Sequence, residues 1–289
     1  MTQRLAVLGF LVLLCGCAAG PNYRKPELPA GSDWVEAAGR QAETPGDQPW
    51  WLVLGDARLN ALMDKALAGN LNVKAAQARI KEAQAGEGGA QAQLMPNVNG
   101  QLVAARANPS TGYHFQDQNQ LQANLNISWE IDLFGAGRRE LEARMAEKDA
   151  AYLNRDAVLL GMTVEVARAY AQLCNAAAQI KVLRTNIETQ SEMLTLTTLR
   201  KQYGLSSALE VAQAAGQVSA TKADLHPLLS LRAQARHRLE LLLGGLPGSL
   251  PELDAIDAGL EPPQTKLVLA SPGSVLVRRP DVALAERGL

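Results

Sequence analysis

One segment of the sequence alternates between apolar and polar residues without interruption over positions 120–133. Its apolar positions are Leu121, Ala123, Leu125, Ile127, Trp129, Ile131 and Leu133. Its polar positions are Gln120, Gln122, Asn124, Asn126, Ser128, Glu130 and Asp132. Successive side chains on a β-strand point to opposite faces, so this pattern predicts a strand with one apolar and one polar face.

The length of this segment and the amide-rich character of its polar face favour a membrane strand. A tilted transmembrane strand needs about 9–11 residues, with one face toward lipid and the other toward a wet lumen. The residues expected to face lipid are Leu121, Ala123, Leu125, Ile127, Trp129 and Ile131. The residues expected to face the lumen are Gln120, Gln122, Asn124, Asn126 and Ser128. A soluble two-stranded ribbon is the alternative interpretation.

A weaker alternation over positions 97–104 provides a partner strand, and the polar connection 108–119 predicts a hairpin loop. Two strands cannot close a barrel, because bacterial barrels begin at about eight strands and an open edge in lipid leaves backbone groups without hydrogen bonds. The chain must therefore oligomerise, lack further strands, or both.

Residues 138–203 contain one Gly and no Pro, which predicts a single long helix. Apolar residues recur there at every seventh position: Met145, Tyr152, Leu159, Val166, Leu173, Ile180, Ile187 and Leu194. This spacing is typical of a left-handed coiled-coil seam. Such a helix would extend about 100 Å at 1.5 Å per residue, which suggests a spacer that reaches across a compartment. Cys174 lies in this pattern and is expected to be a small packing residue.

The helical pattern breaks at residues 203–206 and resumes at once. Ser207 and Glu210 have the spacing of a capping box, which predicts the start of a return helix. Gly244 and Gly245 end that helix, and a Pro-rich connector follows.

The chain begins with Arg4 and an apolar run, Leu5–Leu14, that is too short for a permanent span of about 20 residues. Both features are typical of a secretory signal. The sequence Leu14-Cys15-Gly16-Cys17 resembles a lipobox, so we expect Cys17 to be acylated and Ala18 to favour sorting to the outer membrane. The alternative is an ordinary signal peptide with two incidental cysteines.

The sequence offers no catalytic constellation. Its three histidines, His114, His226 and His237, lack the spacing of metal ligands, and no Gly-rich phosphate loop is present. A net charge of −1, from 28 basic and 29 acidic residues, does not indicate a nucleic-acid surface. We therefore expect no enzyme activity, no metal, no nucleic acid and no cofactor other than the covalent lipid on Cys17.

Several motifs, in shared order, resemble the TolC-like outer-membrane efflux family in its NodT-type lipoprotein branch. They are Trp50-Trp51 with Asp56 and Leu59, Ala66-Leu67 before Asn70, Pro96 before the first strand, residues 129–135, residues 203–205, residues 209–214, residues 241–244, and residues 278–282 with Ala285-Glu286. The resemblance implies a mainly α fold with a membrane β-hairpin. In this family a trimeric β-barrel joins a long periplasmic helical tunnel, and each protomer contains two repeats.

On this resemblance the chain divides into seven parts. They are a lipoprotein signal peptide (1–17), an extended periplasmic tether (18–55), periplasmic helices (56–95), a strand pair with an extracellular loop (96–134), a coiled-coil helical hairpin (138–244, with its tip at 203–207), an equatorial connector (245–280) and a stub of the second repeat (281–289). The last part echoes residues 72–80, so we expect a chain truncated after its first repeat, corresponding to half of a protomer.

The resemblance also implies a function. The chain would be the passive outer-membrane duct of a tripartite system that exports drugs and toxic small molecules, anchored by lipid and extending into the periplasm. Its partners would be two further copies in a homotrimer, a periplasmic membrane-fusion adaptor and an inner-membrane pump of the resistance-nodulation-division class. The tip residues Arg200, Gly204, Leu205 and Ser206 would contact the adaptor. Alternatives are a type I secretion duct, a periplasmic adaptor lipoprotein and a non-functional truncated remnant.

Overall fold

The computed structural model describes residues 19–25, 49–107, 110–111, 114–115, 118–257, 259–260 and 270–289. The signal peptide 1–17, including Cys17, and residues 26–48 of the expected tether lie outside this part of the chain. The chain separates into two compact units. The first contains residues 1–28, 76–154 and 279–289, and the second contains residues 29–75 and 155–278.

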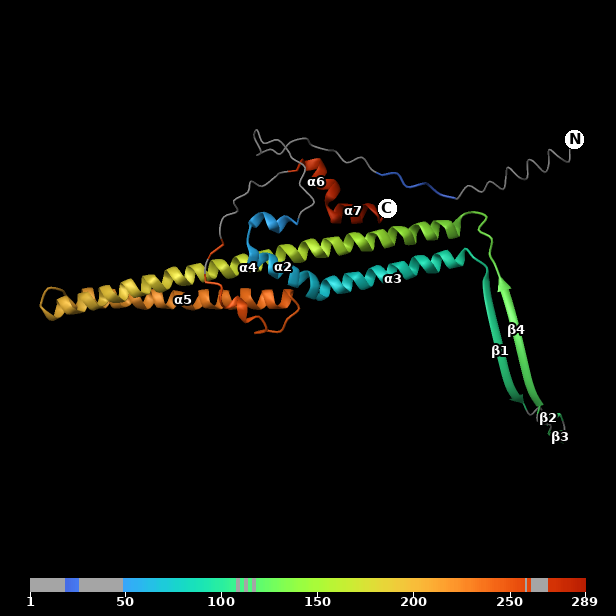
Figure 1. Cartoon of the computed structure of the whole chain (residues 1–289), viewed down its shortest axis with the longest axis horizontal. Coiled ribbons are helices and arrows are strands. Elements are labelled where there is room, and N and C mark those ends of the chain that lie inside the picture. Colours follow the sequence, from blue (N-terminus) through green and yellow to red (C-terminus); the bar gives the residue numbers. More distant parts are fainter. Residues whose placement is uncertain are drawn as a thin grey trace. The chain divides into compact units, whose positions relative to one another are not determined.

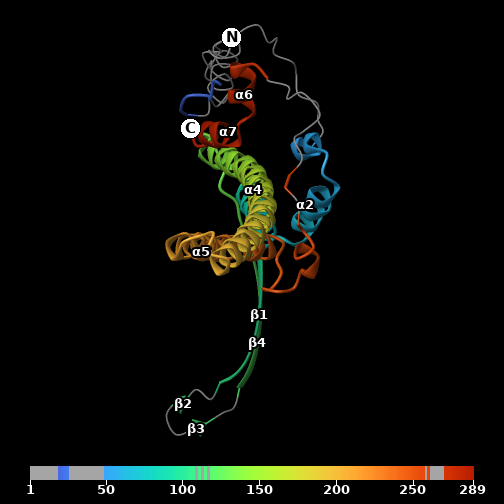
Figure 2. The same cartoon turned by 90° about the vertical axis from the view of Figure 1, so that its left-hand side faces the viewer.

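The first unit contains the predicted hairpin, formed by β1 (Asn97–Ala107) and β4 (Gln118–Ser128), which pair antiparallel (Figure 1). Figure 2 shows the two strands running together along their length. The register pairs apolar residues with apolar residues and amides with amides. The apolar pairs are Val98 with Ile127, Leu102 with Ala123, and Ala104 with Leu121, and the amide pairs are Asn99 with Asn126 and Gln101 with Asn124. The connection carries two short strands, β2 (Ser110–Thr111) and β3 (His114–Phe115), where the sequence predicts only a loop.

The prediction that the strand continues to residue 133 is wrong, because β4 ends at Ser128. Trp129 and Ile131 are therefore not strand residues. The partner of Ser128 is Asn97, the first residue of β1, and Pro96 before it has no backbone N–H to extend the ladder. Instead, the indole Nε1 of Trp129 donates a hydrogen bond to the carbonyl oxygen of Leu94 at 3.1 Å.

Two helices flank the hairpin, α3 (Leu71–Gln93) before it and α4 (Ala136–Gln202) after it. Within the first unit they run side by side (Figure 1), joined by an ion pair of 2.8 Å between Lys148 and Glu87. The turn into α4 uses Gly135 at φ 81°. The Asp132 carboxylate accepts the backbone N–H of Arg138 at 3.0 Å, which satisfies one of the free donors at the start of α4. The unit also contains the short helix α7 (Pro280–Glu286).

The second unit is organised around the middle of α4. Against it pack η1 (Trp50–Leu54), α2 (Ala57–Gly69), α5 (Ala208–Leu242) and η2 (Pro251–Leu253), and α6 (Pro272–Arg278) also belongs to this unit. Of the seven-residue series, Val166, Leu173 and Ile180 are buried in the core, whereas Met145 in the first unit is exposed. By length and composition α4 is also apolar enough to cross a membrane. Among its buried residues, Val166, Tyr170 and Leu173 share a core with residues of α2 and α5.

Residues 50–54 correct the expected tether 18–55, because they form the 3-10 helix η1 rather than extended chain. Trp50 donates from Nε1 to Thr163 Oγ1 at 3.3 Å. Just beyond, Asp56 caps α2 by accepting the N–H of Arg58 at 2.8 Å, and it also accepts the Tyr170 hydroxyl at 2.7 Å. These side-chain bonds fasten the segment to α4.

Candidate functional site

The apolar face of the β-hairpin is exposed along both strands. On β4, Leu121 is 74% exposed and Leu125 is 71% exposed, and on β1 Leu102 is 73% exposed. Val98 and Ile127 extend this surface toward the helical end of the hairpin. An apolar surface of this extent is characteristic of a membrane or protein contact, since soluble monomers rarely leave one open.

On β4, the opposite face of the hairpin is polar and uncharged. Gln120, Gln122, Asn124, Asn126 and Ser128 lie on it and are exposed. Gln122 donates to the Asn124 side-chain oxygen at 3.4 Å, and the opposing strand contributes Asn99 and Gln101. Amide side chains both donate and accept hydrogen bonds, so this face suits contact with water.

The turn between α4 and α5 brings the four predicted tip residues together. The N–H of Leu205 donates to the Arg200 carbonyl oxygen at 2.8 Å, and the N–H of Gly204 donates to the Lys201 carbonyl oxygen at 3.0 Å. With Gly204 at φ 73°, these two bonds constitute a Schellman motif. Leu205 is left 69% exposed. The tip is thus a rigid turn that presents an apolar side chain to the outside.

The capping box predicted at the start of α5 is confirmed. The Ser207 hydroxyl accepts the N–H of Glu210 at 3.2 Å. Hydrogen bonds from the Ser206 hydroxyl and then the Ser207 N–H lower the pKa of Glu210 below its usual value. Ser206 therefore stabilises the turn, and its predicted contact with the adaptor stays a prediction.

The other end of α5 has the same local turn, but it is enclosed. Gly244 lies at φ 77°, and the N–H of Gly245 donates to the Glu240 carbonyl oxygen at 2.8 Å. A Cβ on Gly244 would lie 2.7 Å from the Gly69 carbonyl oxygen, and one on Gly69 would lie 2.5 Å from the Leu243 oxygen. The end of α2 therefore touches the end of α5 backbone to backbone.

Asn70 joins the helices at this enclosed end. It is 4% exposed, and its Nδ2 donates to the Leu242 carbonyl oxygen at 2.8 Å. Its Oδ1 accepts the N–H of Asn72 at 2.9 Å and that of Val73 at 3.2 Å. One side chain thereby caps the start of α3 and satisfies a free carbonyl at the end of α5.

The side chain of Glu240 holds the turn that follows α5. It is 1% exposed, with Oε1 accepting the Gly248 N–H at 2.9 Å and Oε2 lying 3.0 Å from His237 Nδ1. Burial opposes the charged form, but the bonds from His237 and Gly248 and the charge of Arg236 outweigh it, so the pKa of Glu240 lies below its usual value. The sequence reasoning missed Gly69 and Glu240 and used Asn70 only as part of a family motif, although a Gly-Asn pair between two helical stretches was a usable signal of a cap.

A second set of interacting side chains surrounds Tyr170 on α4. Burial, followed by the hydrogen bond to Asp56, raises the pKa of Tyr170, and burial also raises the pKa of the Cys174 thiol. Both groups stay protonated, and Cys174 packs in the core as predicted. The described residues contain no cluster of three or more His, Cys, Asp or Glu side chains suited to a metal. The expected absence of a catalytic, metal or cofactor site stays a prediction.

Comparison with known proteins gives a consistent result. A sequence model of the family described as outer membrane efflux protein matches residues 62–245. The chain is 29% identical over 297 residues to the pyoverdine export outer membrane protein OpmQ of Pseudomonas aeruginosa, covering 99% of this chain and 62% of OpmQ. It is 27% identical over 288 residues to nodulation protein T of Rhizobium leguminosarum bv. trifolii, covering 97% and 60% respectively.

Among solved structures, the outer-membrane channel OprN superposes with a TM-score of 0.80 at 31% identity. The match covers 94% of this chain and 61% of the OprN chain. The chain thus spans about three fifths of the length of the curated relatives that it matches. The predicted fold class, a mainly α TolC-like channel fold with a β-hairpin, is confirmed.

Proposed function

Because the chain belongs to the outer membrane efflux protein family, we propose that it forms part of the outer-membrane duct of a tripartite efflux system. The duct is passive and exports drugs and other toxic small molecules. The name of OpmQ, a pyoverdine export protein, supports a small-molecule cargo. An inner-membrane pump of the resistance-nodulation-division class supplies the energy.

The apolar and the polar face of the hairpin are the main support for this proposal. Its strands have eleven residues each, which agrees with the roughly 9–11 residues that a tilted membrane strand needs. The exposed leucines of the apolar face meet lipid, and the amide face lines a water-filled lumen. The free strand edges pair with other strands of the barrel, which we assign to a homotrimer, because open edges are not tolerated in lipid.

The helical hairpin extends into the periplasm and meets the adaptor at its tip. Arg200, Gly204, Leu205 and Ser206 lie in one turn that the Schellman motif and the capping box make rigid. The exposed Leu205 is the contact residue, since an apolar side chain on a rigid turn loses little conformational freedom on binding. Acyl chains on Cys17 add a lipid anchor in the outer membrane.

A carboxylate placed on one strand face or on the other tests the membrane assignment. The variant Leu125→Asp places a carboxylate on the apolar face. The variant Asn124→Asp places the same group one position earlier, on the polar face. Both proteins are expressed from the gene in a duct-deficient Gram-negative host that carries the pump and adaptor. We expect Leu125→Asp to abolish assembly of heat-modifiable trimers and drug resistance, because a carboxylate in lipid is strongly unfavourable. Asn124→Asp should assemble like the wild type.

Equal tolerance of the two variants would contradict a lipid-facing hairpin. Two assays on the duct-deficient host that expresses the wild-type protein distinguish the cargo. Drug susceptibility reports small-molecule export, and secretion of a type I substrate reports protein export. Restored secretion without restored drug resistance would replace the proposed efflux role with a secretion duct.

A further inference from the structure

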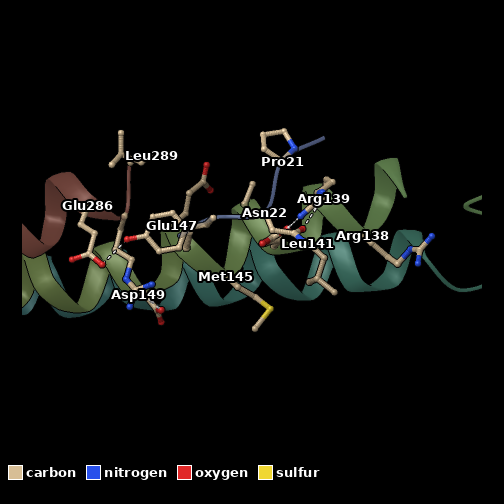
Figure 3. Close-up of a pocket in the computed structure, with 16 residues that line it drawn as sticks. Pro21, Asn22, Arg138, Arg139, Leu141, Met145, Glu147, Asp149, Glu286 and Leu289 are labelled. Atoms are coloured by element: carbon tan, nitrogen blue, oxygen red, sulfur yellow. Dashed lines mark hydrogen bonds and ion pairs between the residues drawn. The ribbon is translucent and has the colours of Figure 1, made fainter. Parts of the chain in front are cut away.

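The described N-terminal residues 19–25 lie along the beginning of α4 within the first unit. Arg139 on α4 donates from Nη2 to the Asn22 side-chain oxygen at 2.7 Å and to the Gly20 carbonyl oxygen at 3.3 Å (Figure 3). The N–H of Ala19 donates to the Phe134 carbonyl oxygen at 3.1 Å. The segment is thus fixed to both the turn that follows the hairpin and the first turn of α4.

The same segment also contacts α7. The Tyr23 hydroxyl donates to Glu286 Oε1 at 2.6 Å, and Lys25 Nζ lies 3.9 Å from the other oxygen of Glu286. The bond to this carboxylate raises the pKa of Tyr23, so its phenol remains a donor at neutral pH. Residues of the segment, α4 and α7 together line a cavity of about 780 Å³ (Figure 3).

These contacts connect three stretches that are distant in sequence. Arg139 also pairs with Glu142 at 2.6 Å, which holds its guanidinium in place. Directly after α7, Arg287 lies 3.9 Å from Asp149 of α4, so the segment reinforces a weak direct contact. The segment therefore has a partner on each side, Arg139 on α4 and Glu286 on α7.

We infer that residues 19–25 act as a strap, which pins α7 onto the beginning of α4. The strap is held by Arg139 of α4 on one side and by Glu286 of α7 on the other, so the loss of either contact should release it.

Trypsin cleavage after Arg24 tests the strap. Arg24 is exposed, and cutting there separates the N-terminal segment from the remaining protein. The detergent-solubilised, full-length protein is digested, and the new terminus at Lys25 is followed by mass spectrometry. We expect Arg139→Gln and Tyr23→Phe each to accelerate this cleavage roughly three- to tenfold, because cleavage follows the population of the released segment. The control Arg144→Gln removes an exposed ion pair elsewhere on α4 and should leave the rate unchanged.

Hydrogen exchange of α7 tests the second contact. In Tyr23→Phe, the amides of Ala283 and Arg287, which are bonded within α7, should exchange several-fold faster than in the wild type. The control Tyr203→Phe alters a tyrosine at the tip and should not change α7. Wild-type cleavage and exchange rates in Arg139→Gln and Tyr23→Phe would overturn the strap.

Discussion

The two ends of α5 show the same turn in opposite surroundings. Gly204 precedes the helix and Gly244 follows it, both at positive φ and both stabilised by a bond from the next N–H to a carbonyl five residues earlier. Nothing lies within 4 Å of a Cβ built on Gly204, whereas one on Gly244 would meet Gly69 at 2.7 Å. The glycine has one task at the tip, its backbone conformation, and two at the enclosed end.

This difference agrees with the proposed roles of the two turns. In the proposed role the tip presents Leu205 to the adaptor, and the stability of its turn comes from local hydrogen bonds. The enclosed end holds α2, α3 and α5 together, and there Asn70 and Glu240 use buried polar groups to satisfy backbone atoms. Two turns with the same backbone geometry are therefore expected to contribute unequally to the stability of the protein.

The largest expected effect is that of Gly244→Ala compared with Gly204→Ala. Both variants force a side chain into the left-handed region, at about 1–2 kcal/mol. Gly244→Ala adds overpacking against the Gly69 backbone, a further cost of about 1–3 kcal/mol. Thermal unfolding in detergent, followed by circular dichroism, should place Gly244→Ala well below Gly204→Ala. Equal midpoints would mean that the enclosed end can open without cost.

Asn70→Ala should have the next largest effect. It removes the cap of α3 and leaves the buried Leu242 carbonyl without its donor, so we expect a loss of about 2–3 kcal/mol. Asn72→Ala is the matched control, because Asn72 is exposed on the same helix and its side chain should matter little. The same unfolding measurement compares them, and similar losses would refute the capping role of Asn70.

The contribution of Glu240 should depend on pH. Its folded pKa lies below the ordinary 4.5, so its stabilisation is present above pH 4.5 and is lost as the pH falls through the folded value. The His237 ring and the Arg236 guanidinium are the side chains that face it. Between about pH 5 and pH 3, the wild type should lose more stability than Glu240→Gln, which cannot ionise. Parallel pH profiles would show that the carboxylate charge plays no part.

The smallest effect on stability is expected for Leu205→Ser. Its side chain is exposed, so the free energy of unfolding should change by no more than about 0.5 kcal/mol. Adaptor binding, measured with the purified adaptor by surface plasmon resonance, should nevertheless weaken at least tenfold if this residue is the contact. Leu231→Ser, at a partly exposed position on α5 away from the tip, is the control for binding. Unchanged affinity in Leu205→Ser would remove the tip from the proposed interface.

The sequence alone predicted the elements that depend on a repeated spacing of residues or on the backbone preference of a single residue. Alternation predicted the hairpin and its two faces, the absence of Pro predicted α4 to within two residues at its start, and Ser207 predicted the start of α5. Trp129 and Ile131 show the limit of this reasoning. Their alternation continues the pattern, but a strand needs a partner with free N–H groups, and Pro96 ends that partner.

Only the tertiary structure shows which residues of different helices and segments contact one another. Gly69 meets Gly244 across 175 positions of sequence, and Arg139 meets Asn22 across 117. Neither pair leaves a periodic or compositional signal, because such contacts depend on where whole helices lie rather than on local propensity. Hydrophobic periodicity thus determined the helices and strands, whereas close backbone approach and side-chain hydrogen bonds determined how they are joined.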